Sequence, residues 1–195
     1  MRIIGGQHRG LRLADPGAGD PRAHLRPTPD RVREAVFNML SGGASGDPLT
    51  GARVLDLFAG TGALGLEALS RGAAQVTFVD HGAAARALIR ENIARLRAMG
   101  CTRLFRRDAT RLGENRGPAF GLVFLDPPYG QGLGAQALAA ARAGGWLTRD
   151  ALVVWEESAP QPAPAGFSLC DQRRYGDTHV TVLRHSGVAD ARADG

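Results

Sequence analysis

A short apolar strand that runs directly into a glycine-rich turn and an apolar helix constrains the fold of this chain more than any other feature. The segment reads VLDLFAGTGALGLEA and covers residues 54–68. Gly60, Gly62 and Gly65 satisfy the pattern G-x-G-x-x-G, and Asp80 follows 20 positions after Gly60. This order is typical of the first strand–helix unit of an open parallel sheet, in which ligands bind beyond the carboxyl ends of the strands.

The alternation of strand and helix continues along the chain. Apolar runs predict strands at 53–58, 75–79, 103–105, 122–126 and 151–155, and helical patterns lie between them at 63–71, 82–99 and 132–144. Strands that are apolar on both faces indicate a parallel sheet covered by helices on both sides. Two last strands, at 166–176 and 178–184, predict a hairpin around a Gly-Asp turn. We therefore predict an α/β fold with a doubly wound, mostly parallel seven-stranded sheet that ends in an antiparallel hairpin.

The N-terminal region has a different pattern. RIIGG and RGLRLA, within residues 1–25, predict a small β-hairpin followed by a loop. Thr28 is predicted as the N-cap of a helix that has Pro29 in its first position and ends near Gly42. We expect one domain over 1–184, made of a basic hairpin and helix (1–41) and a core that carries the site (52–184), and a flexible tail at 185–195.

The positive charge of the chain is concentrated at this N-terminus. The net charge is +5, and all 24 basic residues are arginine. Residues 1–33 hold seven arginines against three acids, which gives +4 of that total. A basic segment on a nearly neutral body favours contact with a polyanion.

Other classes of protein find little support in the composition. The sequence has no apolar run of 18 residues and no signal-peptide core, so we expect a cytoplasmic protein with no membrane contact. Cys101 and Cys170 lack the spacing of metal ligands and are predicted to be free thiols, and we expect no bound metal.

Asp56 bears on which ligand the glycines serve. A dinucleotide would place its pyrophosphate at the helix N-terminus, whereas S-adenosylmethionine has no phosphate and carries an ammonium and a sulfonium. A carboxylate at the end of the strand, four residues before Gly60, suits the cationic ligand. Asp80 can accept from ribose hydroxyls in either case. Asp56 therefore favours S-adenosylmethionine over a nicotinamide cofactor.

Structural alternatives stay open for several of these residues. Asp56 could cap the end of its strand, and Gly62 could serve only a tight turn. Asp108 could accept from an adenine amine, with the amide of Ala109 facing the ring, or it could cap its own loop.

The sequence Asp126-Pro127-Pro128-Tyr129 follows the apolar strand GLVFL. Two prolines fix an extended turn, because each restricts its own φ and the residue before it. Such a turn directs the Asp126 carboxylate and the Pro127 carbonyl into the crevice beside the glycines. Two acceptors suit an exocyclic NH₂ group, and Tyr129 offers a flat face on which a base can stack. The pattern indicates methyl transfer to a planar amine, although a Pro-Pro turn can also be purely structural.

Taken together, the motifs resemble a known family. DLFAGTGALGLEALSRGA and DPPY are similar to amino-methyltransferases of the S-adenosylmethionine-dependent, Rossmann-like class. RIIGGQHRG and RPTPDRVREAVFNML narrow the resemblance to the bacterial family that methylates one guanine of small-subunit (16S) ribosomal RNA on its exocyclic N2, over about residues 2–184. One departure is Leu11, where the family has a basic residue. We expect a monomer that acts on RNA within an assembled or assembling subunit, because so small an enzyme needs proteins to present its target.

The resemblance also implies roles for individual residues. The catalytic set is Asp126, Pro127 and Tyr129. The residues implied to bind the cofactor are Asp56, Phe58, Gly60, Gly62, Asp80, Asp108, Ala109 and Asp126. The arginines implied to face RNA or brace the cofactor are Arg9, Arg12, Arg26, Arg31 and Arg33. Arg31 and Arg33 could instead lie on the solvated face of their helix.

Three other functions fit parts of the pattern. A DPPY turn accommodates any planar NH₂ group, so methylation of DNA adenine or of a protein glutamine is an alternative. A non-catalytic RNA-binding protein on the same fold is another. A nicotinamide oxidoreductase would need hydride-transfer residues that the sequence does not display.

Overall fold

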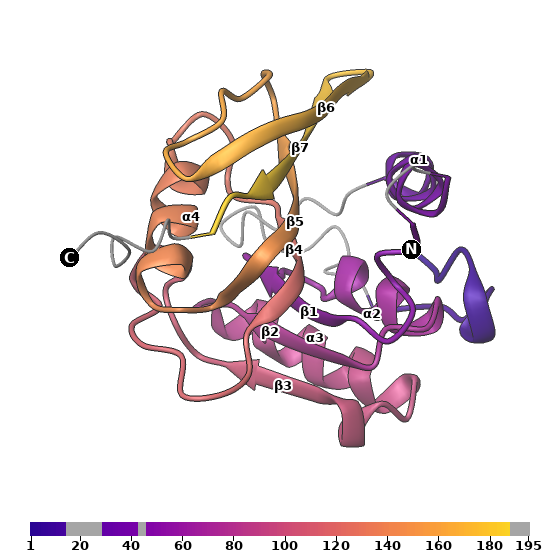
Figure 1. The fold of residues 1–195 in the computed structure, drawn as a ribbon. Coiled ribbons are helices and arrows are strands. Elements are labelled where there is room, and N and C mark those ends of the chain that lie inside the picture. The colour runs from indigo at the N-terminus through magenta and orange to yellow at the C-terminus, as the bar shows by residue number, and fades with distance from the viewer. Residues whose placement is uncertain (15–28, 43–45, 188–195) are drawn as a thin grey trace.

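The computed structural model describes residues 1–14, 29–42 and 46–187, and these form an α/β fold around one seven-stranded sheet (Figure 1). The strand order is β3-β2-β1-β4-β5-β7-β6. The strands are β1 (Arg53–Leu57), β2 (Gln75–Val79), β3 (Thr102–Phe105), β4 (Phe120–Leu125), β5 (Leu147–Glu157), β6 (Phe167–Tyr175) and β7 (Thr178–His185). The first five are parallel, and β7 is antiparallel to both β5 and β6. The predicted fold class is confirmed.

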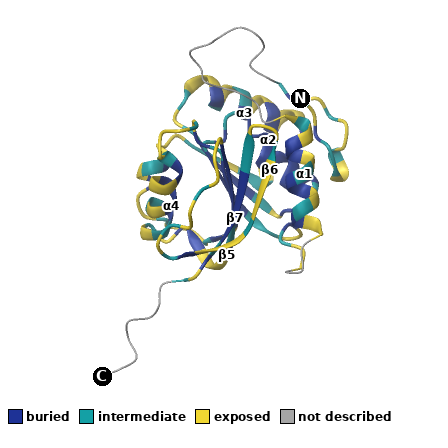
Figure 2. Cartoon of the chain, turned by 90° about the horizontal axis from the view of Figure 1, so that it is seen from above, coloured by how far each residue is buried: buried dark blue, intermediate teal, exposed yellow. Residues whose placement is uncertain are grey.

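Helices cover the two faces of this sheet unequally (Figure 2). Residues of α1 (Asp30–Ser41), α2 (Ala63–Ser70) and α3 (Ala83–Arg95) share one core cluster, and α4 (Leu133–Ala143) packs in a second cluster on the other face. Every residue of α2 is buried. Gly65 lets α2 approach the sheet closely, because a Cβ at this position would lie 2.5 Å from the Phe78 ring.

Element boundaries differ from the sequence prediction where no apolar pattern marks them. β5 begins at Leu147, four residues early, and its exposed residues Thr148, Arg149 and Asp150 carry no hydrophobic signal. The predicted helix over 82–99 ends at Arg95, and Arg97 has a φ of 53°, which a continuing helix does not allow. The next residues form a short 3₁₀ helix, η3 (Met99–Cys101). Cys101 and Cys170 are free thiols.

The N-terminal hairpin is smaller than a pair of strands and is bound firmly to α2. It has one antiparallel bridge, Arg2↔Arg12, and a 3₁₀ turn, η1 (Gly6–His8), near its tip. Gly6 has a φ of 74°, and a Cβ there would lie 1.8 Å from the carbonyl oxygen of Ser70. Ile3 is fully buried in the core cluster that includes α1.

The end of the domain differs from the sequence prediction. His185 was predicted to begin the tail, which is wrong, because it ends β7, is buried and packs on Phe167 at 5.3 Å between ring centroids. Residues 188–195 and the predicted N-cap Thr28 lie outside the described residues. No helix in the described part of the chain is long and apolar enough to cross a membrane.

Candidate active site

The register of the parallel strands aligns a row of side chains at one edge of the sheet. Leu57 pairs with Val79 on one side and with Leu125 on the other, and Leu125 pairs with Trp155. The next residue along each strand therefore falls at the same edge. These four residues, in their order across the sheet, are Asp80, Phe58, Asp126 and Glu156.

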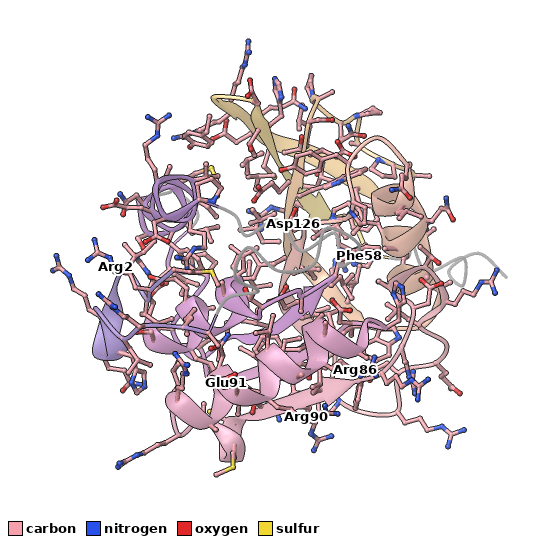
Figure 3. All side chains as sticks on the ribbon, turned by 180° about the vertical axis from the view of Figure 1, so that it is seen from behind. Arg2, Phe58, Arg86, Arg90, Glu91 and Asp126 are labelled. Atoms are coloured by element: carbon pink, nitrogen blue, oxygen red, sulfur yellow. The ribbon has the colours of Figure 1, made fainter. Side chains whose placement is uncertain are left out.

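A cavity of about 690 Å³ opens at this edge. It brings together most of the residues that the sequence predicts for the site. Those that line it are Asp56, Phe58, Gly60, Asp80, Ala109, Asp126, Pro127 and Tyr129. In Figure 3, Phe58 and Asp126 are labelled toward the middle of the view and Arg2 toward its edge. The glycine loop and the DPPY turn thus share one cavity.

Asp56 is a buried carboxyl group in the wall of this cavity. It is 1% exposed, and its Oδ2 accepts from the amide of Gly65 at 3.0 Å. Burial raises the pKa of Asp56 to about 8, the Gly65 bond counteracts this in part, and the nearby charge of Asp80 adds to the rise. Among the described residues Asp56 forms no ion pair. Such a group is suited to an incoming cation.

The same bond decides against a dinucleotide. Gly65 lies in the first turn of α2, and its amide is one of the donors that a pyrophosphate would need. Asp56 Oδ2 already accepts from that amide, so the donor is not available to a pyrophosphate. The glycine pattern here serves a cationic ligand better than an anionic one.

Asp80 holds the glycine loop in place. Its Oδ2 accepts from the amide of Gly60 at 3.0 Å, and its Oδ1 accepts from the amide of Gly82 at 2.7 Å. Phe58, between β1 and the loop, has a φ of 57°, which is uncommon for a residue with a bulky side chain and is typical of functional sites. The loop is therefore fixed before any ligand arrives.

Two residues predicted for the cofactor make structural contacts and do not line the cavity. Gly62 has a φ of 77° and does not line the cavity; a Cβ there would lie 3.3 Å from the Phe78 ring. Its function is the turn into α2, because only glycine fits that backbone against the core. Asp108 Oδ1 accepts from the amide and the hydroxyl of Thr110, and these hydrogen bonds lower its pKa. Asp108 thus caps its own loop, and its contact with the adenine amine stays a prediction.

The DPPY turn is anchored by two acids at the end of β5. The Tyr129 hydroxyl donates to Glu156 Oε1 at 3.0 Å, and the amide of Gly130 donates to Glu157 Oε1 at 2.7 Å. Burial and the neighbouring Glu156 raise the pKa of Tyr129, so its hydroxyl stays protonated and remains a donor. Sequence reasoning missed both acids, although two consecutive acids directly after the apolar run ALVVW are a signal that could have identified them.

The predicted RNA-facing arginines divide into two groups. Arg9, Arg12 and Arg31 are exposed, and Arg26 lies outside the described residues. Arg33 is 0% exposed, donates to Asp30 Oδ1 at 2.6 Å and to the Arg2 carbonyl at 2.7 Å, and lies 4.0 Å from Glu67. The prediction that Arg33 contacts RNA or lies on a solvated helix face is wrong. Arg33 is buried because the buried Glu67 needs cations around it.

Sequence reasoning also missed Glu67. It is the one acid in the buried helix α2, and it accepts from the amides of Ile4 and Gly5 at 2.7 and 2.8 Å and from Arg71 at 2.8 Å. A single acid within an otherwise apolar helix has to be paired, and this signal was available in the sequence. Glu67 attaches the N-terminal segment to the helix behind the glycine loop.

Asn92 of α3 makes a second attachment of the N-terminal segment. Its Oδ1 accepts from the amide of Ala14 at 2.7 Å, and its Nδ2 donates to the carbonyl oxygens of Ala14 and Thr61 at 3.1 and 2.9 Å. Thr61 belongs to the glycine loop and lines the cavity. The buried amide side chain of Asn92 thereby joins the basic N-terminal segment to the wall of the cavity.

Comparisons with known proteins agree with this architecture. Residues 1–184 match a protein family described as conserved hypothetical protein 95. The chain is 36% identical to the ribosomal RNA small subunit methyltransferase D of Escherichia coli K12, over 100% of this chain and 94% of the relative. It is 33% identical to the putative rRNA methyltransferase YlbH of Bacillus subtilis, over 96% and 100%. The solved structure of the putative methyltransferase yhhF from Escherichia coli superposes with a TM-score of 0.78 and 36% identity, over 96% of this chain and 98% of that one.

Both the match over residues 1–184 and the identity to the Escherichia coli relative cover nearly the whole chain, including the N-terminal segment. The chain belongs to the family of the ribosomal RNA small subunit methyltransferase D.

Proposed function

We propose that this protein uses S-adenosylmethionine to methylate the exocyclic N2 of a guanine in small-subunit ribosomal RNA. The observation that carries the proposal is the single cavity lined by Asp56 and the glycine loop on one side and by the DPPY turn on the other. The names of the relatives support a methyltransferase of small-subunit ribosomal RNA. The guanine N2 as the target rests on the family resemblance and on the acceptors of the DPPY turn.

The cavity fits the cofactor by charge and by shape. Asp56 offers a buried carboxyl group for the ammonium, and Asp80, at the rim, retains lone pairs for ribose hydroxyls beyond its two amide bonds. Phe58, Leu64 and Ala109 supply an apolar wall. When bound, S-adenosylmethionine supplies an electrophilic methyl group on a positively charged sulfur.

The DPPY turn holds the amine that is methylated. The Asp126 carboxylate and the Pro127 carbonyl each accept one hydrogen of the NH₂ group, which directs the nitrogen lone pair away from the ring plane. As the N–C bond forms, the bond between the methyl group and sulfur breaks and S-adenosylhomocysteine would leave. The amine then loses one proton, which Asp126 or water accepts. Positioning supplies most of the rate enhancement, because the methyl donor needs no further activation.

Tyr129 provides the stacking face for the base. Its hydroxyl donates to Glu156, so the ring is held at one edge of the cavity rather than turning freely. Stacking of a base on an aromatic side chain contributes about 1–3 kcal/mol.

A transfer assay tests the proposed function. Labelled S-adenosylmethionine is supplied with naked small-subunit RNA or with assembled subunits that lack the modification, and the product nucleosides are separated. We expect N2-methylguanosine, with the assembled or partly assembled subunit as the better substrate. Label on adenine N6 or in protein glutamine, or binding of RNA with no transfer at all, would contradict the proposal.

A further inference from the structure

Glu156 is a buried acid whose place in the cavity the chemistry above does not use. It is 4% exposed, lies at the end of β5 and lines the cavity beside Asp126. Because Leu125 pairs with Trp155, the register puts Asp126 and Glu156 on neighbouring strands, about 4.8 Å apart in backbone spacing. Two acceptors therefore stand next to each other where the base would lie.

The order of the acids across the sheet separates cofactor from substrate. Asp80 follows β2, Asp56 belongs to β1, Asp126 follows β4, and Glu156 belongs to β5. If the cofactor occupies the β2–β1 side and the amine is held at Asp126, the part of the base next to the amine faces β5.

Guanine differs from adenine and from a glutamine amide in the atom beside the NH₂ group. In guanine the N2 amine is flanked by N1–H, a second donor. In adenine the N6 amine is flanked by N1, an acceptor, and a glutamine amide has no second donor beside its NH₂ group. A carboxylate beside the amine site accepts from guanine and repels the adenine lone pair.

We propose that Glu156 reads the N1–H of the target guanine and so determines specificity for this base. The proposal rests on the proposed function, because it assumes that the amine is guanine N2. Tyr129 donates to Glu156 Oε1 at 3.0 Å and thereby orients the carboxylate. We assign Oε2 to the base, since each carboxylate oxygen has two lone pairs and accepts more than one hydrogen bond.

A base replacement at the target position tests this contact directly. 2-Aminopurine keeps the N2 amine of guanine but has a lone pair at N1 in place of the hydrogen. Subunits are reconstituted with RNA that carries either base at the target, and single-turnover rates of N2 methylation are measured at saturating cofactor. We expect the wild type to prefer guanine by about 10- to 100-fold, the range for a hydrogen bond to a charged group.

Glu156→Gln should remove this preference. The amide keeps the shape, its Oε1 still accepts from Tyr129, and its NH₂ group then faces the base and can donate to N1 of 2-aminopurine. The rate with guanine should fall about tenfold or more, the rate with 2-aminopurine should rise, and their ratio should approach one. Glu156→Asp keeps a carboxylate that accepts hydrogen bonds, so it should lower both rates and retain the preference for guanine. This variant tests the proposal even if Glu156→Gln does not fold.

A matched control separates a direct contact with the base from a structural effect on the DPPY turn. Glu157→Gln alters the adjacent acid, which binds the Gly130 amide and does not line the cavity, so both bases should change by the same factor. A Glu156→Gln variant that slows both bases equally would overturn the inference, while N2-methylguanosine formation by the wild type still upholds the proposed function. Absence of that product with the wild type would overturn both.

Discussion

Asp56 links cofactor binding to pH. Its pKa is raised to about 8 by burial, so at neutral pH the free protein holds it mostly protonated. An ammonium ligand favours the ionised form, and binding should therefore release a proton. Cofactor affinity should fall by up to about tenfold per unit as the pH is lowered from 8 to 6. Calorimetry in buffers of different ionisation enthalpy measures the proton, and an affinity that does not change over this range would contradict the assignment.

The sign of the effect on stability follows from the same group. The pKa of Asp56 is higher in the folded protein than in the unfolded chain, where it is near 3.8. Its contribution to the free energy of unfolding is thus fully present below pH 3.8 and is lost as the pH rises through about 8. Asp56→Asn mimics the protonated carboxyl group, and it should remove both the pH dependence and the release of a proton.

Asp126 should matter for the transfer rate more than for binding. Its carboxylate contacts the amine most strongly as that nitrogen gains positive charge. Asp126→Ala should lower the single-turnover rate by about 10²–10³, the scale for losing one preorganised electrostatic partner. Cofactor titration of the same variant should show an affinity close to wild type. A variant that transfers at the wild-type rate would make Asp126 a structural residue.

At the scale of elements, Glu67 should control the stability of the contact between α2 and the N-terminal segment. It is fully buried and has two amides and two arginines around it. Glu67→Ala removes the buried carboxylate that accepts from the Ile4 and Gly5 amides and from Arg71, and should lower the free energy of unfolding by about 3–5 kcal/mol. Glu91 pairs with Arg95 on the surface of α3, and Glu91→Ala should cost at most about 0.5 kcal/mol. Equal losses in urea unfolding would contradict this account.

The elements themselves were largely predictable, because their hydrophobic period is strong. β2 matches its predicted range, and α2 and α4 differ by one residue at most at each end. Exposed Thr148 and Asp150 lie in the irregular part of β5 between the pairs Phe120↔Leu147 and Leu122↔Leu152, which no apolar pattern marks. Site residues directly after strands, such as Asp80 and Asp126, followed from the rule that ligands bind at the carboxyl ends of strands.

The pairing partners of buried charges were not predictable in the same way. Arg33 and Arg31 look alike in sequence, and only the position of α1 relative to α2 puts one in the core and leaves the other exposed. Gly62 and Gly60 belong to one motif, yet Gly62 faces Phe78 and Gly60 faces the cavity. These distinctions depend on contacts between residues far apart in the chain.

At the scale of the whole molecule, the exposed arginines of the N-terminal hairpin should bind RNA phosphates. Replacing Arg9 and Arg12 together should weaken RNA binding and make the salt dependence shallower by about 1–2 in slope. Cofactor affinity should not change, because neither residue lines the cavity. The same charge change at exposed Arg103 and Arg116 is the matched control. Lost cofactor binding with an unchanged salt slope would assign Arg9 and Arg12 to folding.

The attachment by Asn92 has a consequence for amide hydrogen exchange. The first residues of a chain usually exchange rapidly because they fray. Here the amide of Ala14 donates to a fully buried side chain, and the same side chain donates to Thr61 in the glycine loop. The Ala14 amide is therefore released only when the packing of α3 opens, and its deuteration should be as slow as that of the helix core. In Asn92→Ala the amides of Ala14 and of the glycine loop should both gain deuterium faster than in the wild type, because the loss of this one side chain releases both segments.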